Sequence, residues 1–191
     1  MKASFQKFDE DLFLLLNTLT SDISDQFWIV MTKPLFWSPL FLLIFILFFM
    51  AFKRRTAVIY SMGLITSFWG VYAVSYVVKH IVQRPRPLLN ENLIAHMNIL
   101  YEPTGFSFFS GHASTSMAAA TFFYLIFHDK SKWAKLMFLF PLLFSLSRIF
   151  VGVHYPSDIF VGGVIGFLFG GMCFFVFRKI NDKYFLQKPF A

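Results

Sequence analysis

Long stretches without a charged residue are the feature that most restricts how this chain can fold. The stretches 35–52, LFWSPLFLLIFILFFMAF, and 159–177, IFVGGVIGFLFGGMCFFVF, each approach the roughly 20 apolar residues that cross a bilayer as a helix. Lipid offers no partner to a free backbone N–H or C=O group, so such stretches must be helical. Charged residues also make up only 14% of the chain, whereas soluble domains hold about a quarter. The sequence therefore predicts an all-α, polytopic transmembrane helix bundle.

The apolar stretches divide the chain into segments that cross the membrane and segments that do not. Five ranges are predicted to span it: 35–52, 57–78, 112–127, 136–153 and 159–177. The first 34 residues mix apolar and acidic side chains, which predicts one or two short helices at the membrane interface. A sixth, imperfect span is the alternative for this segment. We therefore expect an N-terminal interfacial segment, residues 1–34, and a transmembrane domain, residues 35–191.

The distribution of charge predicts which way the bundle faces. The net charge of +7 comes from basic residues that punctuate the apolar stretches and form no solvated face, which argues against nucleic-acid binding. If the connections alternate sides, residues 53–55, 128–135 and 178–188 share one side and carry ten of the seventeen Lys and Arg residues, while eight of the ten acidic residues fall on the other side. The excess of cations predicts that the first side is cytoplasmic and that the second faces the periplasm or cell exterior.

Three stretches on the predicted outer side carry ionisable groups, which are costly inside a membrane bundle and mark function. They are KHIVQRPRP (79–87), FSGHAS (109–114) and SRIFVGVHYPSD (147–158). Their cations are Lys79, Arg84, Arg86 and Arg148. Several cations with few carboxylates predict a dianionic ligand, and the arginine fork matches phosphate oxygens. For Arg84, a supporting phosphate contact and a solvated loop charge both remain open.

The stretch Ser110–Gly111–His112 opens a predicted helix and offers a second means of holding an anion. Free backbone N–H groups and the positive end of the helix dipole point outward from such a helix start. Ser110 is a suitable N-cap residue and can also donate its hydroxyl group.

The two histidines supply reactivity. A neutral imidazole is a nucleophile near neutral pH, and a second imidazole can serve as general acid. Asp158 follows His154 by four residues, with Pro156 suited to the first turn of the last helix. The carboxylate can accept a hydrogen bond from Nδ1–H and leave Nε2 free to attack, as the aspartate of a catalytic triad does. The sequence holds no carboxylate cluster for magnesium and a single cysteine, Cys173, so we expect no metal or other cofactor.

Together these residues resemble a known family. Lys79–x6–Arg86–Pro87, Ser110–Gly111–His112 and Ser147–Arg148–x5–His154–x3–Asp158 are similar to the three signatures of the type-2 phosphatidic acid phosphatase superfamily, over roughly residues 55–178. The resemblance implies a metal-independent lipid phosphatase that forms a phosphohistidine. It implies His154 as the nucleophile, Asp158 as its orienting residue and His112 as the acid for the leaving group. The implied phosphate ligands are Lys79, Arg86, Ser110, Gly111 and Arg148. One departure is Phe109, where the family usually has proline.

Three glycines in the last predicted span repeat every fourth residue: Gly162, Gly166 and Gly170. Small residues at this spacing let two helices approach closely, so the pattern predicts tight packing, with a ligand groove as the alternative.

The expected function is that of an integral membrane phosphatase, multi-pass in the cell inner (plasma) membrane, with its site facing the periplasm or exterior. It would remove a terminal phosphate from an isoprenoid diphosphate, phosphatidylglycerophosphate, phosphatidate or lipid A phosphate. The bilayer and this lipid are the expected partners. Two alternatives remain: a non-enzymatic binder or transporter of anionic lipids, and a lipid phosphotransferase.

Overall fold

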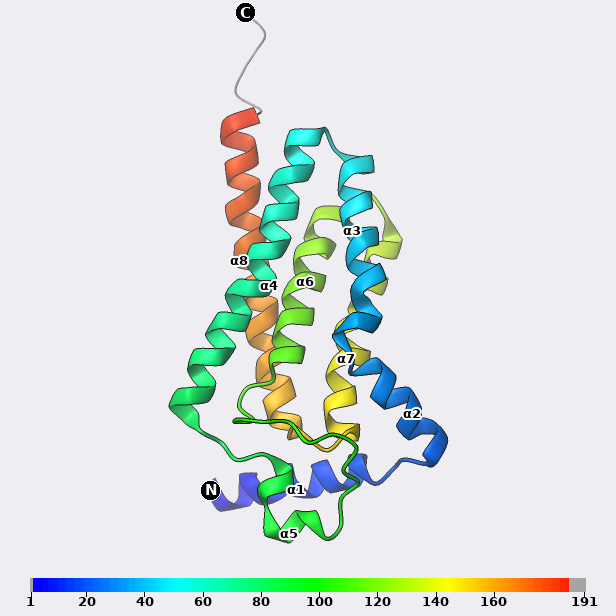
Figure 1. Ribbon diagram of the computed structural model, residues 1–191. Helices are drawn as coiled ribbons and strands as arrows, with labels where there is room; N and C mark the ends of the chain where they lie inside the picture. The colour runs from blue at the N-terminus through cyan, green and yellow to red at the C-terminus, as the bar shows by residue number, and fades with distance from the viewer. Residues whose placement is uncertain (1, 186–191) are drawn as a thin grey trace, which may run out of the picture.

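The computed structural model describes residues 2–185, and this part of the chain consists of helices joined by loops (Figure 1). The α-helices are α1 (Lys2–Asn17), α2 (Asp22–Met31), α3 (Ser38–Ala51), α4 (Arg54–Val82), α5 (Glu91–Ile94), α6 (Gly111–Phe127), α7 (Leu139–Phe150) and α8 (Pro156–Phe185). Short 3₁₀ helices are η1 (Pro34–Trp37), η2 (Pro87–Leu89) and η3 (Lys132–Phe138). The predicted all-α class is confirmed for the described residues.

Helix α6 lies at the centre of the bundle. It packs against α4, α7 and α8, which run along the same long direction together with α3 (Figure 1). Its sequence, GHASTSMAAATFFYLIF, is rich in Ala, Ser and Thr. These small side chains let the neighbouring helices approach closely, and most side chains of α6 are buried in consequence.

Each of the five predicted spans corresponds to a helix. Four segments of the described chain are long and apolar enough to cross a membrane: Pro34–Ala51, Arg54–Ile94, Lys132–Phe150 and Pro156–Lys183. The remaining range, 112–127, forms α6, which has 17 residues and is enclosed by the other helices. The longest helices extend beyond the apolar ranges, because polar residues continue α4 to Val82 and α8 to Phe185.

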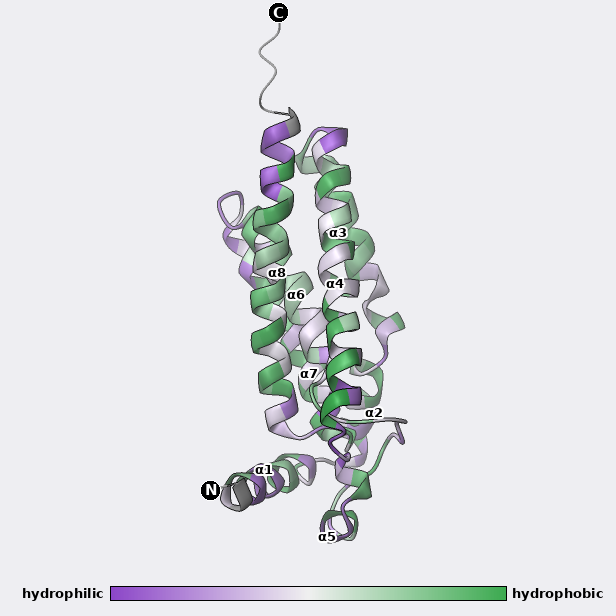
Figure 2. Cartoon of the chain, turned by 90° about the vertical axis from the view of Figure 1, so that its left-hand side faces the viewer, coloured by the Kyte–Doolittle hydropathy of each residue, from purple (hydrophilic) through white to green (hydrophobic). Residues whose placement is uncertain are grey.

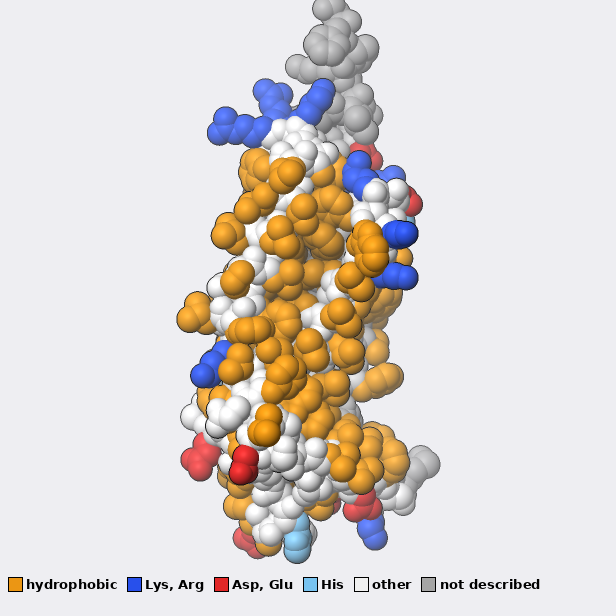
Figure 3. Space-filling model, turned by 90° about the vertical axis from the view of Figure 1, so that its right-hand side faces the viewer, with side chains coloured by type: hydrophobic (Ala, Val, Ile, Leu, Met, Phe, Trp, Pro, Cys, Tyr) orange, Lys and Arg blue, Asp and Glu red, His pale blue; other side chains and the backbone are white. Residues whose placement is uncertain are grey.

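The surface of the molecule separates into an apolar middle and two charged ends. Hydrophobic residues follow one another along the bundle in Figure 2, and their side chains cover its middle in Figure 3. Exposed ones include Leu42, Phe49, Trp69 and Phe175. Lys and Arg side chains gather at the end that carries the α3–α4 turn, whereas the opposite end carries acidic side chains (Figure 3). The apolar middle fits a lipid environment, which accepts exposed apolar side chains.

Two helices precede the first apolar segment, and neither is among the four segments long enough to span. Helix α1 lies crosswise at the end of the bundle (Figure 1). Its buried face consists of three residues spaced four apart, Asp9, Phe13 and Asn17, none of which is more than 3% exposed. Asn17 donates from Nδ2 to the carbonyl of Ile149 at 3.0 Å, and Phe13 packs in a cluster with Tyr155. Helix α1 is therefore fixed to the turn between α7 and α8.

The glycines of α8 lie against the backbone of α6. A Cβ atom built on Gly162, Gly166 or Gly170 would lie 2.7, 2.3 or 2.4 Å from the carbonyl oxygens of Ser110, Ser114 and Ala118, respectively. These distances are below any van der Waals contact, so no side chain fits at these positions. The predicted tight packing is confirmed, and the groove alternative is wrong because α6 fills this space.

Candidate active site

The predicted site residues come from four helices that end or begin at the α1 end of the bundle. Lys79 lies in the last turn of α4, Arg86 in the loop after α4, Ser110, Gly111 and His112 at the start of α6, Arg148 in the last turn of α7, His154 in the α7–α8 turn and Asp158 in the first turn of α8. The structure thus brings the three separated stretches together. Direct contacts join them: Ser110 N–H donates to the Asp158 carbonyl at 3.0 Å, and Arg86 lies 3.4 Å from His154.

The imidazole of His154 is held from both sides. Its Nδ1 lies 3.3 Å from Oδ2 of Asp158, and its Nε2 lies 3.4 Å from Nη1 of Arg86. Asp158 is itself fully buried, and its Oδ2 accepts the backbone N–H of Tyr155 at 3.1 Å. The tautomer with the proton on Nδ1 satisfies the carboxylate and leaves the Nε2 lone pair for a reacting atom beside Arg86.

A tight turn places this histidine. The backbone N–H groups of Val153 and His154 both donate to the carbonyl of Arg148, at 3.0 and 3.2 Å. Gly152 in this turn has a φ of +83°, and a Cβ there would lie 2.8 Å from the carbonyl oxygen of Asn98. Glycine is required for both reasons, because other residues avoid this φ and would collide.

The protonation state of His154 follows from its surroundings. Burial lowers its pKa well below the ordinary 6.5, and the positive charges of Arg148, Arg86 and Lys79 lower the pKa further. The imidazole is therefore neutral at neutral pH, which is the form a nucleophile needs.

The cations around His154 differ in how fully their N–H groups are hydrogen-bonded. Lys79 donates to the carbonyls of Phe106 and Ser107 at 2.8 and 3.0 Å, and Arg86 donates to Val153 at 2.9 Å. Arg148 is 5% exposed and donates from Nη1 to the hydroxyl of Thr32, while its Nε is buried with no hydrogen-bond partner in residues 2–185. An unpartnered, buried guanidinium donor is costly, and an anion would satisfy it.

His112 approaches the site from the start of α6. Its ring packs on Phe144 with centroids 4.3 Å apart, and its Nε2 lies 3.3 Å from the carbonyl oxygen of Thr32. The cap predicted for this helix is present, since Ser110 accepts the N–H of Ala113 at 3.4 Å. Thr32 thus contacts two predicted site residues at once, through its carbonyl to His112 and through its hydroxyl to Arg148.

Phe109 occupies the position where the family usually has proline. It is fully buried, and its carbonyl accepts the hydroxyl of Ser75 at 3.2 Å. A hydrophobic anchor and a hydrogen bond to α4 hold the start of α6 at this position.

Sequence reasoning missed three residues and left one undecided. Thr32, Asp9 and Ser157 matched no motif, although the spacing of Asp9, Phe13 and Asn17 was a signal of a buried helix face. Arg84 is not a solvated loop charge. It forms ion pairs with Asp158 and Asp9, both at 2.7 Å, and its guanidinium lies 4.0 Å from the centre of the Tyr155 ring.

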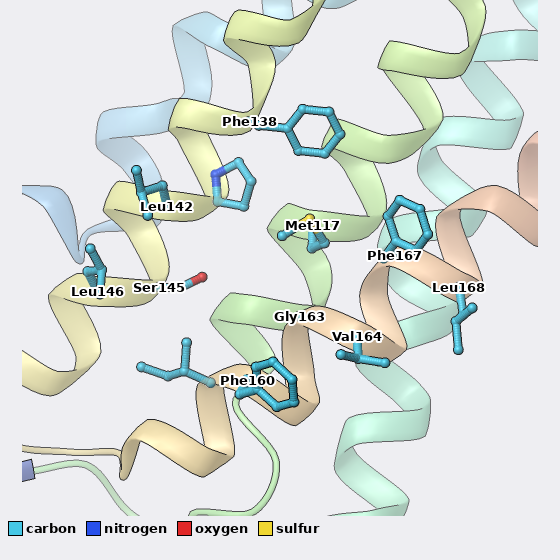
Figure 4. A pocket seen from close by; sticks show the side chains of 12 residues that line it. Met117, Phe138, Leu142, Ser145, Leu146, Phe160, Gly163, Val164, Phe167 and Leu168 are labelled. Atoms are coloured by element: carbon cyan, nitrogen blue, oxygen red, sulfur yellow. The ribbon is translucent and has the colours of Figure 1, made fainter. Parts of the chain in front are cut away.

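The apolar cavities that flank α7 include two that also border the first half of α6. One of about 310 Å³ includes His112 and is lined by aromatic side chains from η1, α3, α4 and α7, among them Trp37, Phe68, Tyr72 and Phe144. The other, of about 600 Å³, lies between α6, α7 and α8, and Figure 4 shows its lining of Leu142, Phe160, Phe167 and similar residues. Of the predicted site residues, Gly111 and His112 line the first cavity and none lines the second.

The chain is similar to known proteins over most of its length. Residues 56–182 match the family model described as the PAP2 superfamily. A lipid A 4'-phosphatase of Bacteroides thetaiotaomicron is 27% identical over 180 residues, which cover 92% of this chain and 79% of that protein. An undecaprenyl-diphosphatase of Sulfolobus acidocaldarius is 29% identical over 164 residues, 83% of this chain and 73% of that protein.

Two solved structures share the architecture. The crystal structure of Aquifex aeolicus LpxE has a TM-score of 0.66 and 27% identity, and covers 85% of this chain and 92% of that one. A transmembrane PAP2-type phosphatidylglycerolphosphate phosphatase from Bacillus subtilis has a TM-score of 0.67 at 21% identity, covering 98% of this chain and 90% of that one. The second likeness concerns the fold alone.

Proposed function

Because this chain belongs to the PAP2 superfamily, we propose that it hydrolyses the terminal phosphate of a membrane lipid through a phosphohistidine on His154, without a metal ion. The chain is a multi-pass membrane protein and a phosphoric ester hydrolase. The observation that carries the proposed mechanism is the placement of His154, whose Nδ1 faces Asp158 and whose Nε2 faces Arg86.

In the first step, Nε2 of His154 attacks the phosphorus atom and the bond from phosphorus to the lipid oxygen breaks. His112 gives its proton to the departing oxygen, and the Asp158 carboxylate stabilises the positive charge that develops on His154. Arg148, Arg86 and Lys79 hold the phosphoryl oxygens, together with Ser110 and the backbone of Gly111. Fixed positive charges lower the barrier most when they are aimed at charge that grows in the transition state.

In the second step, a water molecule attacks the phosphohistidine. His112, now neutral, accepts a proton from this water, the bond from nitrogen to phosphorus breaks, and inorganic phosphate leaves. Both histidines return to their starting protonation states. Binding of the phosphate requires that Thr32 release Arg148 and His112, and the unpartnered Nε of Arg148 supports an anion at this place.

The apolar part of the substrate would lie in the aromatic cavity that includes His112. Besides Gly111 and His112, this cavity is lined by side chains of α3 and α4, including Phe41 and Trp69. We propose a phosphorylated saccharolipid of the lipid A type as the preferred substrate, because the similar lipid A 4'-phosphatase aligns with 92% of this chain. An isoprenoid diphosphate is the second candidate, favoured by the similarity to an undecaprenyl-diphosphatase over 83% of the chain.

The proposed location is the inner (plasma) membrane with the site facing the periplasm or cell exterior. The charge asymmetry supports this orientation, since Lys and Arg gather at the end remote from His154 (Figure 3). We also propose that residues 1–34 lie at the interface on the outer side of this same membrane and that residues 35–191 form the phosphatase domain. The crosswise position of α1 supports this division (Figure 1).

The test is phosphate release from a panel of purified lipids: a lipid A bisphosphate, undecaprenyl diphosphate, phosphatidylglycerophosphate and phosphatidate. The wild-type protein should release phosphate fastest from the lipid A substrate, and His154→Ala should release none. Binding of a lipid without phosphate release from any member would favour a binder or transporter. Loss of phosphate from one lipid with its appearance on another would identify a phosphotransferase.

A further inference from the structure

Asp9 of α1 is a buried carboxylate outside every family motif. It is 3% exposed, although aspartate is rarely buried unless it is paired. Its Oδ1 accepts the backbone N–H of Ser157 at 2.9 Å, and its Oδ2 accepts the hydroxyl of the same serine. Asp9 is therefore bound to the first turn of α8, 148 residues further along the chain.

A second contact connects Asp9 to the nucleophile. Arg84 donates from Nη2 to Asp9 Oδ2 and from Nη1 to Asp158 Oδ1, both at 2.7 Å. The other oxygen of Asp158 faces Nδ1 of His154 at 3.3 Å. A continuous series of contacts thus leads from α1 to the imidazole: Asp9, Arg84, Asp158, His154.

We propose that Asp9 is a positioning residue for the nucleophile, acting through Arg84 on the carboxylate that orients His154. The inference rests on the proposed phosphohistidine mechanism. It extends the catalytic apparatus to the N-terminal helix, which lies outside the matched range 56–182.

The geometry gives Asp9 two effects on Asp158. First, Arg84 is held at a fixed position by two carboxylates and by the face of Tyr155, so the Asp158 oxygen that it contacts cannot rotate. Second, Asp9 shares the charge of Arg84. Without Asp9, the full positive charge of Arg84 would act on Asp158 and weaken that carboxylate as an acceptor for His154.

A contact that only anchors α1 would not need Arg84. The two bonds to Ser157, the hydrogen bonds of Asn17 and the packing of Phe13 already fix the helix to the α7–α8 turn. Arg84 also donates to Ser157 Oγ at 2.7 Å. The contact between α1 and α8 is thus already made by hydrogen bonds, and the ion pair of Asp9 with Arg84 is additional to it. The ion pair with Asp9 is therefore suited to controlling how strongly Arg84 acts on the Asp158 carboxylate.

The titratable and charged groups around His154 determine the expected pH dependence. They are Lys79 of α4, Arg84 and Arg86 of the following loop, His112 of α6, Arg148 of α7 and Asp158 of α8. Cations are in excess, so removal of the negative charge of Asp9 makes protonation of His154 harder. The acidic limb of the pH profile should therefore move to lower pH when Asp9 is neutralised.

The experiment measures phosphoenzyme formation in a single turnover of the full chain in detergent, with the best lipid of the panel. At a saturating concentration of lipid, the observed rate constant of the first turnover does not depend on how many molecules are active, so an unfolded fraction leaves it unchanged. Asp9→Asn should lower it about 10- to 100-fold, the range found when the partner that orients a metal-binding side chain is removed, and should move the acidic limb to lower pH. Asp11→Asn is the matched control, since Asp11 lies exposed on the same helix, and it should match the wild type.

Two further results decide the proposal. Asp9→Glu keeps the negative charge and should retain the wild-type pH profile. A folded Asp9→Glu protein as slow as Arg84→Gln would overturn the assignment. So would an Asp9→Asn protein with the wild-type rate constant and profile, even at a reduced yield, because Asp9 would then only hold α1 in place. Inactivity of the wild-type protein on every lipid would instead refute the proposed function.

Discussion

Gly166→Ala tests the close packing of α8 on α6 and its importance for the site. The Cβ atom of an alanine would lie 2.3 Å from the carbonyl oxygen of Ser114 and 2.9 Å from the Cα atom of the same residue. Both atoms belong to the α6 backbone, which cannot rotate aside as a side chain would. Since ordinary contact begins at 3.4 Å, the two helices would have to separate by about 1 Å at this point.

The size of the effect follows from this displacement. Overpacking a well-packed interior costs about 1–3 kcal/mol, and contact with backbone places this variant near the upper value. The N-terminal ends of the same two helices carry Asp158 and His112, joined by the 3.0 Å bond from Ser110 N–H to the Asp158 carbonyl. A misplacement of roughly 1 Å at a catalytic group costs on the order of 100-fold in rate. We therefore expect a large loss of kcat together with the loss of stability.

The assay compares Gly166→Ala with Gly171→Ala, by thermal unfolding in detergent and by kcat. Gly171 lies on the same helix, and a Cβ there meets nothing within 4 Å. Both variants gain the same small stabilisation that alanine brings to a helix, about 0.4–1 kcal/mol, so their difference isolates the collision. The free energy of unfolding of Gly166→Ala should be lower by about 3 kcal/mol. Equal stability and equal kcat in the two variants would refute the reasoning.

Three other predictions concern the chemistry and the orientation. His154→Ala should lower activity by several powers of ten on every substrate. His112→Ala should slow the hydrolysis of a lipid monophosphate more than that of p-nitrophenyl phosphate, whose leaving group needs no proton. Equal losses from His112→Ala would mean that this residue only binds phosphate. Activity should persist in excess EDTA, because the charged groups around His154 are mainly cations; inactivation that magnesium reverses would overturn the mechanism. In a chain with Cys173 replaced, a cysteine at Glu91 should be labelled from outside intact cells and one at Lys132 should not; the reverse pattern would place the site in the cytoplasm.

The sequence predicted those features that depend on local composition or on short spacing. The apolar ranges located five helices, because lipid requires both apolar side chains and internally bonded backbone. The spacing of His154 and Asp158 predicted their contact, since a helix start brings residues four apart together. Helix ends were less well predicted. The structure continues α4 and α8 into polar residues, which a hydropathy pattern does not detect.

Contacts between distant segments were beyond sequence reasoning. Thr32 reaches Arg148 across 116 positions, and Asp9 reaches Arg84 across 75. Neither residue type indicates its partner, because an aspartate in an amphipathic helix is usually solvated. Arg84 shows the same limit: its charge was evident, but its two carboxylate partners depend on how α1 folds back across the bundle.

The path of α1 across the end of the bundle determines the order in which this protein can be assembled. Ribosomes synthesise α1 before any spanning helix, yet Ser157, its partner through Asp9, comes 148 residues later. Helix α1 therefore lacks its contact with α8 until Ser157 has been synthesised. Its docking follows the insertion of α3, α4, α6 and α7, and such long-range closure is a slow step in folding. A bulky fusion placed before α1 would consequently act on the final stage of biogenesis and leave membrane insertion intact.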